Sequence, residues 1–261
     1  MVLAISWSPV GLSADSQAEL AKQALNPIAA LYSVPIQYNW NQKLGLGGDG
    51  EQSVTNLQPV LPFSLNDDWN LISRTILPII DQHGLVPGGS GDSFGIGDVT
   101  QSLFFSPKQP TASGWIWGAG PAMLLATGGD ERLSAEQWAA GPTVVALKQS
   151  NGWTRGVLAN HLWTLDDSPP DNKRKINQTF AQPFFSYTTQ TYTTYGINTE
   201  STYDWQAREW SIPINLFVSQ LFKVGRHPMS LQAGPRYWVE SPRDGAQGWG
   251  FRMALTLLFP K

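Results

Sequence analysis

The sequence predicts an all-β fold, a transmembrane antiparallel β-barrel of about twelve strands with a short N-terminal helix. Long segments alternate between large apolar residues and small or polar ones, compact and long connections alternate, and tryptophans gather at the ends of the expected strands. Charged residues make up 14% of the 261-residue chain, against roughly 25% in ordinary soluble proteins. With 12 Trp, 25 Gly and 19 Pro, the composition suits strands whose outer face does not meet water.

The first residues have some of the character of an export signal. Residues 1–14 are moderately apolar and end in Leu12-Ser13-Ala14, which resembles a cleavage motif, although the basic start of a secretory signal is missing. We interpret residues 1–14 as the remnant of a signal peptide, and a disordered N-terminal tail is the alternative.

A helical pattern covers residues 16–33. Ser16 followed by Glu19 resembles a capping box, and Asn26-Pro27 interrupts the run. The expected divisions of the chain are the signal remnant, an N-terminal helical segment that lies in the periplasm or plugs the lumen, and the barrel: 1–14, 15–35 and 36–261.

Beyond the helix the hydrophobic pattern has a period of two, which predicts strands. In the last strand, Trp249, Phe251 and Met253 face one way, and Gly250 and Arg252 face the other. The second face of each strand carries too few charges for the solvated side of a soluble β-sandwich, the alternative fold, so we expect it to line a barrel. The expected strands are 36–45, 52–65, 69–81, 94–107, 115–127, 138–149, 153–165, 176–189, 192–205, 210–224, 228–240 and 249–260.

The connections between these strands alternate in length. Even-numbered connections are compact, as at 66–68 and 150–152, whereas odd-numbered ones such as 82–93 and 166–175 are longer and richer in Gly, Pro and charge. The segment 206–209 is the exception. Such parity is typical of bacterial outer-membrane barrels, which have short turns on one side, long loops on the other and an even number of strands.

Tryptophan lies at the ends of many strands. A soluble core explains any one of these residues, but eight at strand ends predict an aromatic girdle at the membrane interface. The girdle candidates are Trp69, Trp115, Trp138, Trp153, Trp163, Trp205, Trp210 and Trp249.

Prolines inside the strands argue against a regular barrel. Proline removes a ladder donor and belongs at edges or bulges, yet a closed barrel has no edge. We therefore expect bulges, eased by the glycine that precedes proline in the A-G-P motifs at 119–121, 140–142 and 233–235. The prolines concerned are Pro59, Pro62, Pro78, Pro121, Pro142, Pro183, Pro213 and Pro235.

Several kinds of chemistry are not supported by the sequence. The absence of cysteine excludes disulfides, thiolate metal sites and a cysteine nucleophile, and a net charge of −3 gives no reason to expect a nucleic-acid partner. No phosphate-loop, dinucleotide, zinc-protease or nucleophile-elbow motif occurs. The acidic segment 128–137 could meet calcium or cations bound to lipopolysaccharide, but a solvated loop is our interpretation. We assign no catalytic residue, metal site or cofactor.

The three histidines, His83, His161 and His227, are far apart in the sequence. His161 lies within a strand and is the candidate base for a hydrolase embedded in the barrel. Its neighbour Asn160 points to the opposite face of the strand, so the two are not simple partners.

Charged residues within the strands are the functional candidates. If they face the lumen, they set its selectivity as channel lining, or they form a structural ion-pair network that fills a narrow barrel. A barrel of about twelve strands is wide enough for a channel, yet side chains or a plug can fill it. The candidates are Arg74, Asp98, Glu200, Arg236 and Arg252.

Four stretches carry a family resemblance: NLQPVLPFSLNDDWNLISRTILPII at 56–80, GIGD at 95–98, WIWGAGP at 115–121 and LTLLFPK at 255–261. From about residue 19 to its end, the chain resembles outer-membrane proteins described only as transporters, which are grouped with proteins of the MetA pathway of phenol degradation. The chain departs from many barrels by placing Pro260-Lys261 after its last aromatic residue.

The resemblance implies export through the periplasm to a Gram-negative outer membrane, where the partners are the bilayer, lipopolysaccharide, the barrel-assembly machinery and a small solute. It carries over no site residues, because the function of the family is itself inferred.

The leading expectation is a channel for passive passage of small molecules, hydrophobic or aromatic ones among them. The first alternative is a non-conducting barrel that anchors or adheres through its long loops. The second is the embedded hydrolase.

Overall fold

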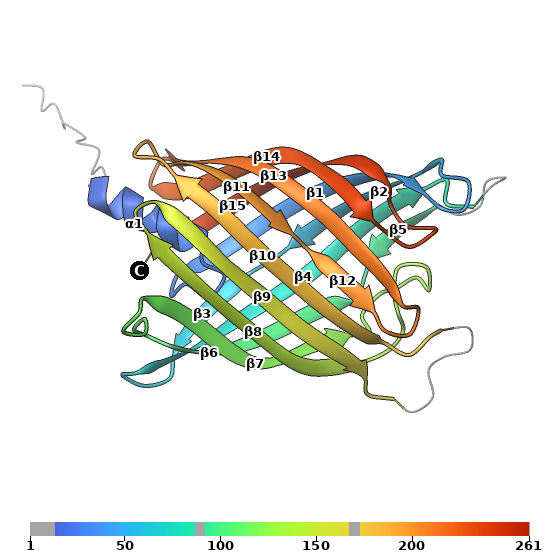
Figure 1. The fold of residues 1–261 in the computed structure, drawn as a ribbon, viewed down its shortest axis with the longest axis horizontal. Coiled ribbons are helices and arrows are strands. Elements are labelled where there is room, and N and C mark those ends of the chain that lie inside the picture. The colour runs from blue at the N-terminus through green and yellow to red at the C-terminus, as the bar shows by residue number, and fades with distance from the viewer. Residues whose placement is uncertain (1–13, 87–91, 167–172, 261) are drawn as a thin grey trace, which may run out of the picture.

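The computed structural model describes residues 14–86, 92–166 and 173–260, which form a closed antiparallel barrel (Figure 1). Fifteen strand segments belong to one sheet, which the pairing of β1 with β15 closes. Because β2 and β3, β5 and β6, and β11 and β12 each form one interrupted strand, the barrel has twelve strands, which confirms the predicted fold class. The segments are β1 (Tyr32–Leu44), β2 (Gly50–Leu57), β3 (Val60–Ser64), β4 (Trp69–His83), β5 (Ser93–Ile96), β6 (Val99–Pro107), β7 (Trp115–Leu125), β8 (Ala139–Ser150), β9 (Trp153–Thr164), β10 (Asn177–Thr188), β11 (Thr193–Thr199), β12 (Ser201–Asp204), β13 (Glu209–Val224), β14 (His227–Glu240) and β15 (Gly248–Phe259).

The N-terminal helix is shorter than predicted. Helix α1 spans Ala14–Ala24, not 16–33, because the Asn26 side chain accepts a hydrogen bond from the Ile28 amide at 3.0 Å and Pro27 cannot continue the helix. The chain then runs irregularly to Tyr32, where β1 begins four residues before the predicted position. The expected signal remnant lies outside the described residues except for its last position. Among the described helices, none is long and apolar enough to cross a membrane.

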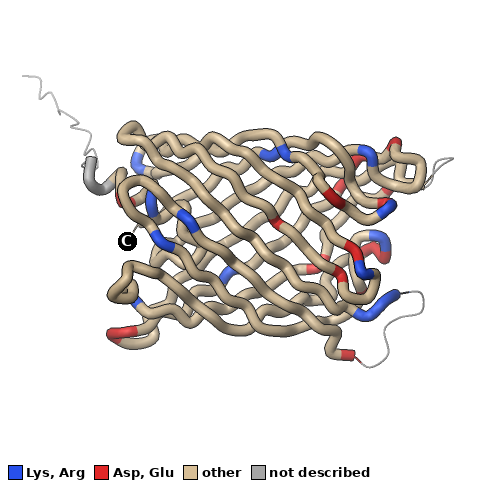
Figure 2. The backbone as a smooth tube through the Cα atoms, viewed as in Figure 1, with Lys and Arg blue, Asp and Glu red and all other residues tan. Residues whose placement is uncertain are grey.

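Apart from the short connection between β12 and β13, compact turns and long connections lie at opposite ends of the barrel. Helix α1 and the C-terminus share the left-hand end in Figure 1 with the compact turns, as the loop parity predicts. One of these turns has φ values of 50° at Asn151 and 80° at Gly152, which is the left-handed geometry of a tight hairpin turn. Figure 2 shows the charged residues mostly toward the two ends, with acidic residues gathered at the end with the long connections. Parts of the predicted loops 82–93 and 166–175 lie outside the described residues.

The wall separates two kinds of side chain. On β15, Trp249, Phe251 and Met253 are exposed on the outside, whereas Arg252 and Leu258 are buried inside. The predicted alternation of faces is therefore present. The many large apolar side chains exposed on the outside suit contact with lipid, because a soluble protein rarely exposes a large contiguous apolar surface.

Most of the predicted girdle residues are exposed on this exterior. The exception is Trp69, which is half-buried and meets the ring of Trp117 edge-on at a centroid distance of 5.9 Å. Their placement at a membrane interface stays a prediction. The exposed girdle candidates are Trp115, Trp138, Trp153, Trp163, Trp205, Trp210 and Trp249.

The A-G-P motifs resolve the problem of proline in a closed barrel. At each motif the pairing with one neighbouring strand skips two residues and then resumes in the same register, for example from Ala140↔Trp163 to Thr143↔Asn160. The bulges expected at these motifs were therefore wrong, because a local gap in the ladder accommodates the missing proline donor without a register shift. A register shift does occur at Ile212/Pro213.

Glycine is required at these gaps because the neighbouring backbone comes very close. A Cβ added at Gly120, Gly141 or Gly234 would lie 1.8 to 2.0 Å from a carbonyl oxygen of the adjacent strand, a distance that real structures do not show. The glycine of each motif thus permits the close approach, and the proline after it requires no ladder partner on that side.

We expect Gly141→Ala to destabilise the barrel by roughly 1–3 kcal/mol, because the added methyl must displace backbone. Urea unfolding of the refolded protein, with heat-modifiable migration in detergent as the readout of the folded fraction, measures the loss of stability. Gly129→Ala is the matched control, since a Cβ there meets nothing within 4 Å. Equal stability of the two variants would contradict the close-approach explanation.

Candidate functional site

Four of the five predicted charged candidates meet inside the lumen. Arg252 on β15, Arg236 on β14, Arg74 on β4 and Glu200, at the break between β11 and β12, approach one another from different parts of the wall. We call these four residues the lumenal arginine cluster. Their roles as channel lining or structural network stay a prediction, but their positions now separate them into two groups.

Arg252 is the most enclosed member of the cluster. Its side chain is 2% exposed, and its two Nη atoms donate to the two carboxylate oxygens of Glu200 at 2.9 and 2.5 Å. Its Nε atom donates to Asn39 Oδ1 at 2.7 Å. A planar guanidinium that meets a carboxylate in this two-point manner is held in one orientation. Arg252 and Glu200 are therefore a fixed ion pair that links β15 to the strand formed by β11 and β12, which is not a ladder neighbour of β15.

Arg236 supports the same ion pair from one side. Its Nη1 atom lies 3.4 Å from Glu200 Oε2 and also donates to the side-chain oxygens of Asn39 at 3.3 Å and Asn215 at 3.4 Å. The guanidinium carbon lies 4.8 Å from the ring centroid of Trp238, a favourable cation–π distance. Its Nε atom is buried and makes no hydrogen bond within the described part of the chain. Arg236 is thus enclosed by polar and aromatic side chains.

Arg74 is held differently from the other two arginines. It is half-buried, and its Nη2 atom donates to Gln58 Oε1 at 2.9 Å. In the described residues it makes no ion pair with a carboxylate within 4.0 Å. The cluster therefore contains one arginine that remains open to the lumen beside two that are closed off.

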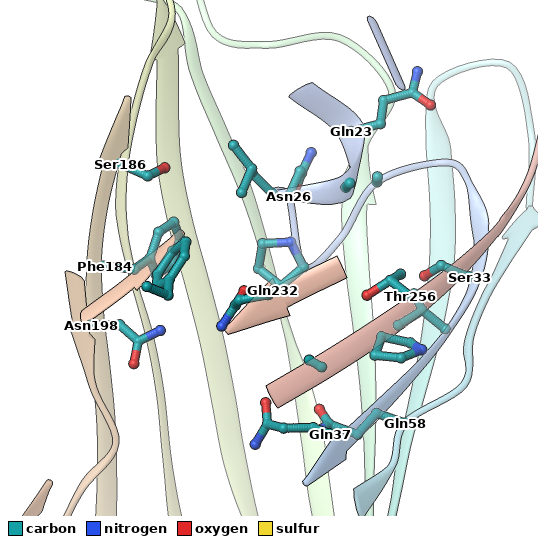
Figure 3. A pocket seen from close by; sticks show the side chains of 18 of the residues that line it. Gln23, Asn26, Ser33, Gln37, Gln58, Phe184, Ser186, Asn198, Gln232 and Thr256 are labelled. Atoms are coloured by element: carbon teal, nitrogen blue, oxygen red, sulfur yellow. The ribbon is translucent and has the colours of Figure 1, made fainter. Parts of the chain in front are cut away.

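Two cavities meet at this cluster. The helix-side cavity, of about 200 Å³, lies below the end of α1 and is lined by residues that include Asn26, Phe184 and Gln232 (Figure 3). The long-loop cavity, of about 300 Å³, lies toward the other end and is lined by residues that include Leu124 and Phe180. Both cavities share the same boundary residues: Gln37, Gln58, Arg74 and Gln182.

The segment after α1 reaches into the barrel. Ile28 is buried in an apolar cluster with inner-wall residues of β3, β4, β6, β8 and β9, among them Phe104 and Leu147. Ala29 and Leu31 pack with Leu258 of β15 in a second apolar cluster. Residues 25–31 therefore occupy part of the lumen on the short-turn side.

Asp98, the fifth candidate, lies apart from the cluster. It sits in the gap between β5 and β6 and accepts hydrogen bonds from the Ser134 hydroxyl at 2.7 Å and from the Gly128 and Ala135 amides at 3.0 and 2.7 Å. The carboxylate thus fastens the connection between β7 and β8 to the barrel rim. The sequence pattern did not distinguish a rim residue from a residue of the central lumen.

Two acids of the segment 128–137 form ion pairs, Asp130 with Arg132 inside the segment and Glu136 with Lys173 outside it. Asp130 accepts from Arg132 at 2.8 Å, and this guanidinium holds the pKa of Asp130 at about 2. No group of three or more potential metal ligands occurs among the residues that the structure describes.

His161 faces the outside of the barrel, whereas Asn160 lines the long-loop cavity, as the strand alternation predicts. The His161 ring contacts side chains of the neighbouring strand β10, with Nδ1 2.7 Å from Thr179 Oγ1 and Nε2 3.0 Å from Asn177 Oδ1. Its ring centroid lies 4.1 Å from that of Trp163. These partners on β10 lie 16 and 18 residues away, so sequence proximity could not identify them.

The sequence analysis did not identify the amide side chains of the site. Asn39 bonds to both Arg236 and Arg252, and Asn215 connects Arg236 to Asn198 on β11. A signal was present in β1, where Gln37, Asn39 and Asn41 share one face. Inward amides are informative because they satisfy buried guanidinium groups without adding charge.

We expect Glu200→Gln to lower the free energy of unfolding by roughly 3–5 kcal/mol, because the change leaves two enclosed arginines without their carboxylate. Urea titration of the refolded barrel in detergent measures the loss. Glu209→Gln at the exposed start of β13 is the control and should change little. Equal effects of the two substitutions would show that the ion pair contributes nothing special to stability.

The sequence comparisons identify no family. No family model matches the chain, and no curated protein sequence matches it significantly. The structural comparisons do find similar folds. An outer-membrane channel from Pseudomonas putida F1 superposes with a TM-score of 0.69 at 16% identity, covering 88% of this chain and 96% of that protein. The outer-membrane phospholipase A of Escherichia coli superposes with a TM-score of 0.51 at 11% identity, covering 89% and 99%.

At these identities the likeness concerns the fold. That fold, a closed twelve-stranded antiparallel barrel, is one that bacterial outer-membrane proteins adopt. The exposed apolar residues of its wall agree with a lipid environment. The chain is therefore a β-barrel of the bacterial outer membrane.

Proposed function

We propose that the protein is a passive channel for small molecules, hydrophobic or aromatic ones among them. The observation that carries the proposal is the pair of lumenal cavities that share Gln37, Gln58, Arg74 and Gln182 as a common boundary. A solute that enters one cavity has a short path to the other. The fold of the Pseudomonas putida channel gives further support. We also propose that the chain is related to the transporters grouped with the phenol-degradation proteins, on the basis of its sequence motifs.

Residues 25–31 are the proposed plug of this channel. They fill lumen space on the short-turn side, where Ile28 and Leu31 are buried. The segment is held by apolar packing, and helix α1 before it accepts a hydrogen bond at the Lys22 carbonyl from Gln149 Nε2 at 2.8 Å. Such a segment narrows the opening on its side, next to the helix-side cavity that it lines. A rigid, non-conducting barrel that acts through its long loops has no need of two adjoining cavities in its lumen.

We expect single-channel steps from the refolded full chain in a planar bilayer and larger steps when residues 15–30 are deleted. The deletion keeps all of β1, which begins at Tyr32, and removes material that narrows the lumen. Heat-modifiable migration checks that both proteins are folded. Silence from both folded proteins would reject the channel and favour the anchoring barrel.

A second candidate function rests on the hydrogen bonds of His161. Thr179 Oγ1 accepts from Trp205 Nε1 at 2.8 Å, so its own proton is available for His161 Nδ1, while His161 Nε2 donates to Asn177 Oδ1. A hydroxyl, an imidazole and an orienting amide in this order form the basis of nucleophilic catalysis. A hydrolase also requires donors for the oxyanion. Among the described residues, the hydrogen bonds of this group of side chains include no such donor beyond the Trp205 indole, so we prefer the channel.

For the channel we expect His161→Ala to leave the conductance unchanged, because His161 faces away from the lumen. The same protein preparations, assayed with a p-nitrophenyl ester in detergent, should show no hydrolysis that depends on His161. Thr179→Val is the companion variant, since it removes the hydroxyl and keeps the shape. Turnover by the unaltered chain that both substitutions abolish would establish the hydrolase.

A further inference from the structure

The charges that surround the lumenal cavities do not balance. The cluster contains three arginines and one glutamate, and both oxygens of Glu200 are already bonded to Arg252. Among the described residues that line the two cavities, Glu200 is the one acid. The cluster therefore has an excess of positive charge inside a barrel wall, where unpaired charge is costly and marks functional sites.

Arg74 is the member that a solute can reach. Arg236 and Arg252 are 7% and 2% exposed, whereas Arg74 is half-buried and lines both cavities. Of the five N–H donors of a guanidinium, Gln58 takes one from Arg74 at 2.9 Å. No other hydrogen bond of the Arg74 side chain occurs within the described chain, and none of its nitrogens is buried without a partner. Its remaining donors are therefore open to the cavities.

The surroundings of Arg74 combine this charge with an apolar wall. The long-loop cavity presents Leu124, Leu158, Leu162 and Phe180, and the amides of Gln58 and Gln182 adjoin Arg74 at its floor. The volume of about 300 Å³ falls at the lower end of the roughly 300–1,000 Å³ found for small-molecule sites. Such a cavity accommodates a small apolar body whose polar end points toward the guanidinium.

We propose that Arg74 binds the carboxylate of a small organic acid with an apolar or aromatic body, and that such acids are the solutes of the channel. The inference rests on the proposed channel function and names its substrate class. The open edge of the guanidinium offers two parallel N–H groups to a carboxylate. The body of the acid lies against Leu158 and Phe180 on one side of Arg74, and Phe184 continues the apolar surface into the helix-side cavity.

The position of Arg74 between the cavities explains how binding serves passage. An anion held there is exposed to both cavities at once, and the flanking glutamine amides can donate to it as it moves. The two enclosed arginines remain bonded to Glu200 and Asn39 throughout, so the positive potential of the site persists. Binding and release then require no energy source beyond the concentration gradient.

Calorimetric titration of the refolded full chain with benzoate tests the site. Benzyl alcohol has the same ring without the charge and serves as the neutral probe. We expect Arg74→Gln to weaken benzoate binding at least tenfold and to leave benzyl alcohol unaffected. Arg155→Gln, on the exposed outer face of β9, is the matched control and should bind benzoate like the unaltered chain. Equal benzoate affinity in the Arg74 and Arg155 variants would overturn the proposal.

Two further measurements keep the outcome decisive. Arg74→Lys retains the charge without the two-point geometry, so we expect an intermediate affinity, and this variant serves if Arg74→Gln fails to fold. Chloride that displaces benzoate at equal concentration would overturn the organic acid in favour of an inorganic anion. Conductance steps without Arg74-dependent binding would reject the site and retain the channel. Arg74-dependent binding without conductance would retain the site and reject the channel.

Discussion

Closure of the backbone hydrogen-bond ladder is the constraint on which the structure depends. Lipid offers no partner for an unpaired N–H or C=O group, so the first and last strands must pair, as β1 and β15 do over nine residue pairs from Tyr32↔Phe259 to Trp40↔Phe251. The prolines fit this constraint because each A-G-P motif confines the lost donor to one short gap. Gly141 and its counterparts let the backbones approach there, so the ladder resumes in the same register.

Closing twelve strands has a second consequence, since it creates an interior wider than single side chains fill. This chain fills the interior differently on two sides. The walls formed by β3, β4, β6, β8 and β9 carry an apolar cluster that receives Ile28, whereas β1, β13, β14 and β15 carry amides and arginines. Arginine suits the second wall because its long side chain reaches past the neighbouring strands to Glu200. The polar wall thus connects strands that share no ladder contact.

The sequence was sufficient to predict the fold because period-two alternation and loop parity can both be read along the chain. Both patterns are what a closed membrane barrel requires of its strands and connections. The same signals identified the lumenal charges, because a charged side chain on a strand with an apolar outer face must point into the lumen, away from lipid. They could not place Asp98 at the rim, because its partners Ser134 and Ala135 belong to a connection with no periodic pattern. The predicted helix was too long for a related reason. Apolar residues such as Ile28 continue the helical pattern of the sequence, but they pack against the barrel wall instead.

The division of the lumen into two walls also limits the solutes that the proposed channel can pass. A fully apolar solute gains from Phe180 and Leu158 but meets a row of amides and guanidinium groups that it cannot satisfy. A small hydrophilic ion bonds to those polar groups but loses its hydration beside the apolar wall without a replacement partner. A molecule with both characters can keep one contact of each kind as it moves past Arg74, because this residue belongs to both cavities. The channel proposed here therefore favours amphipathic anions through the geometry of its lumen, with no moving part required at the cluster.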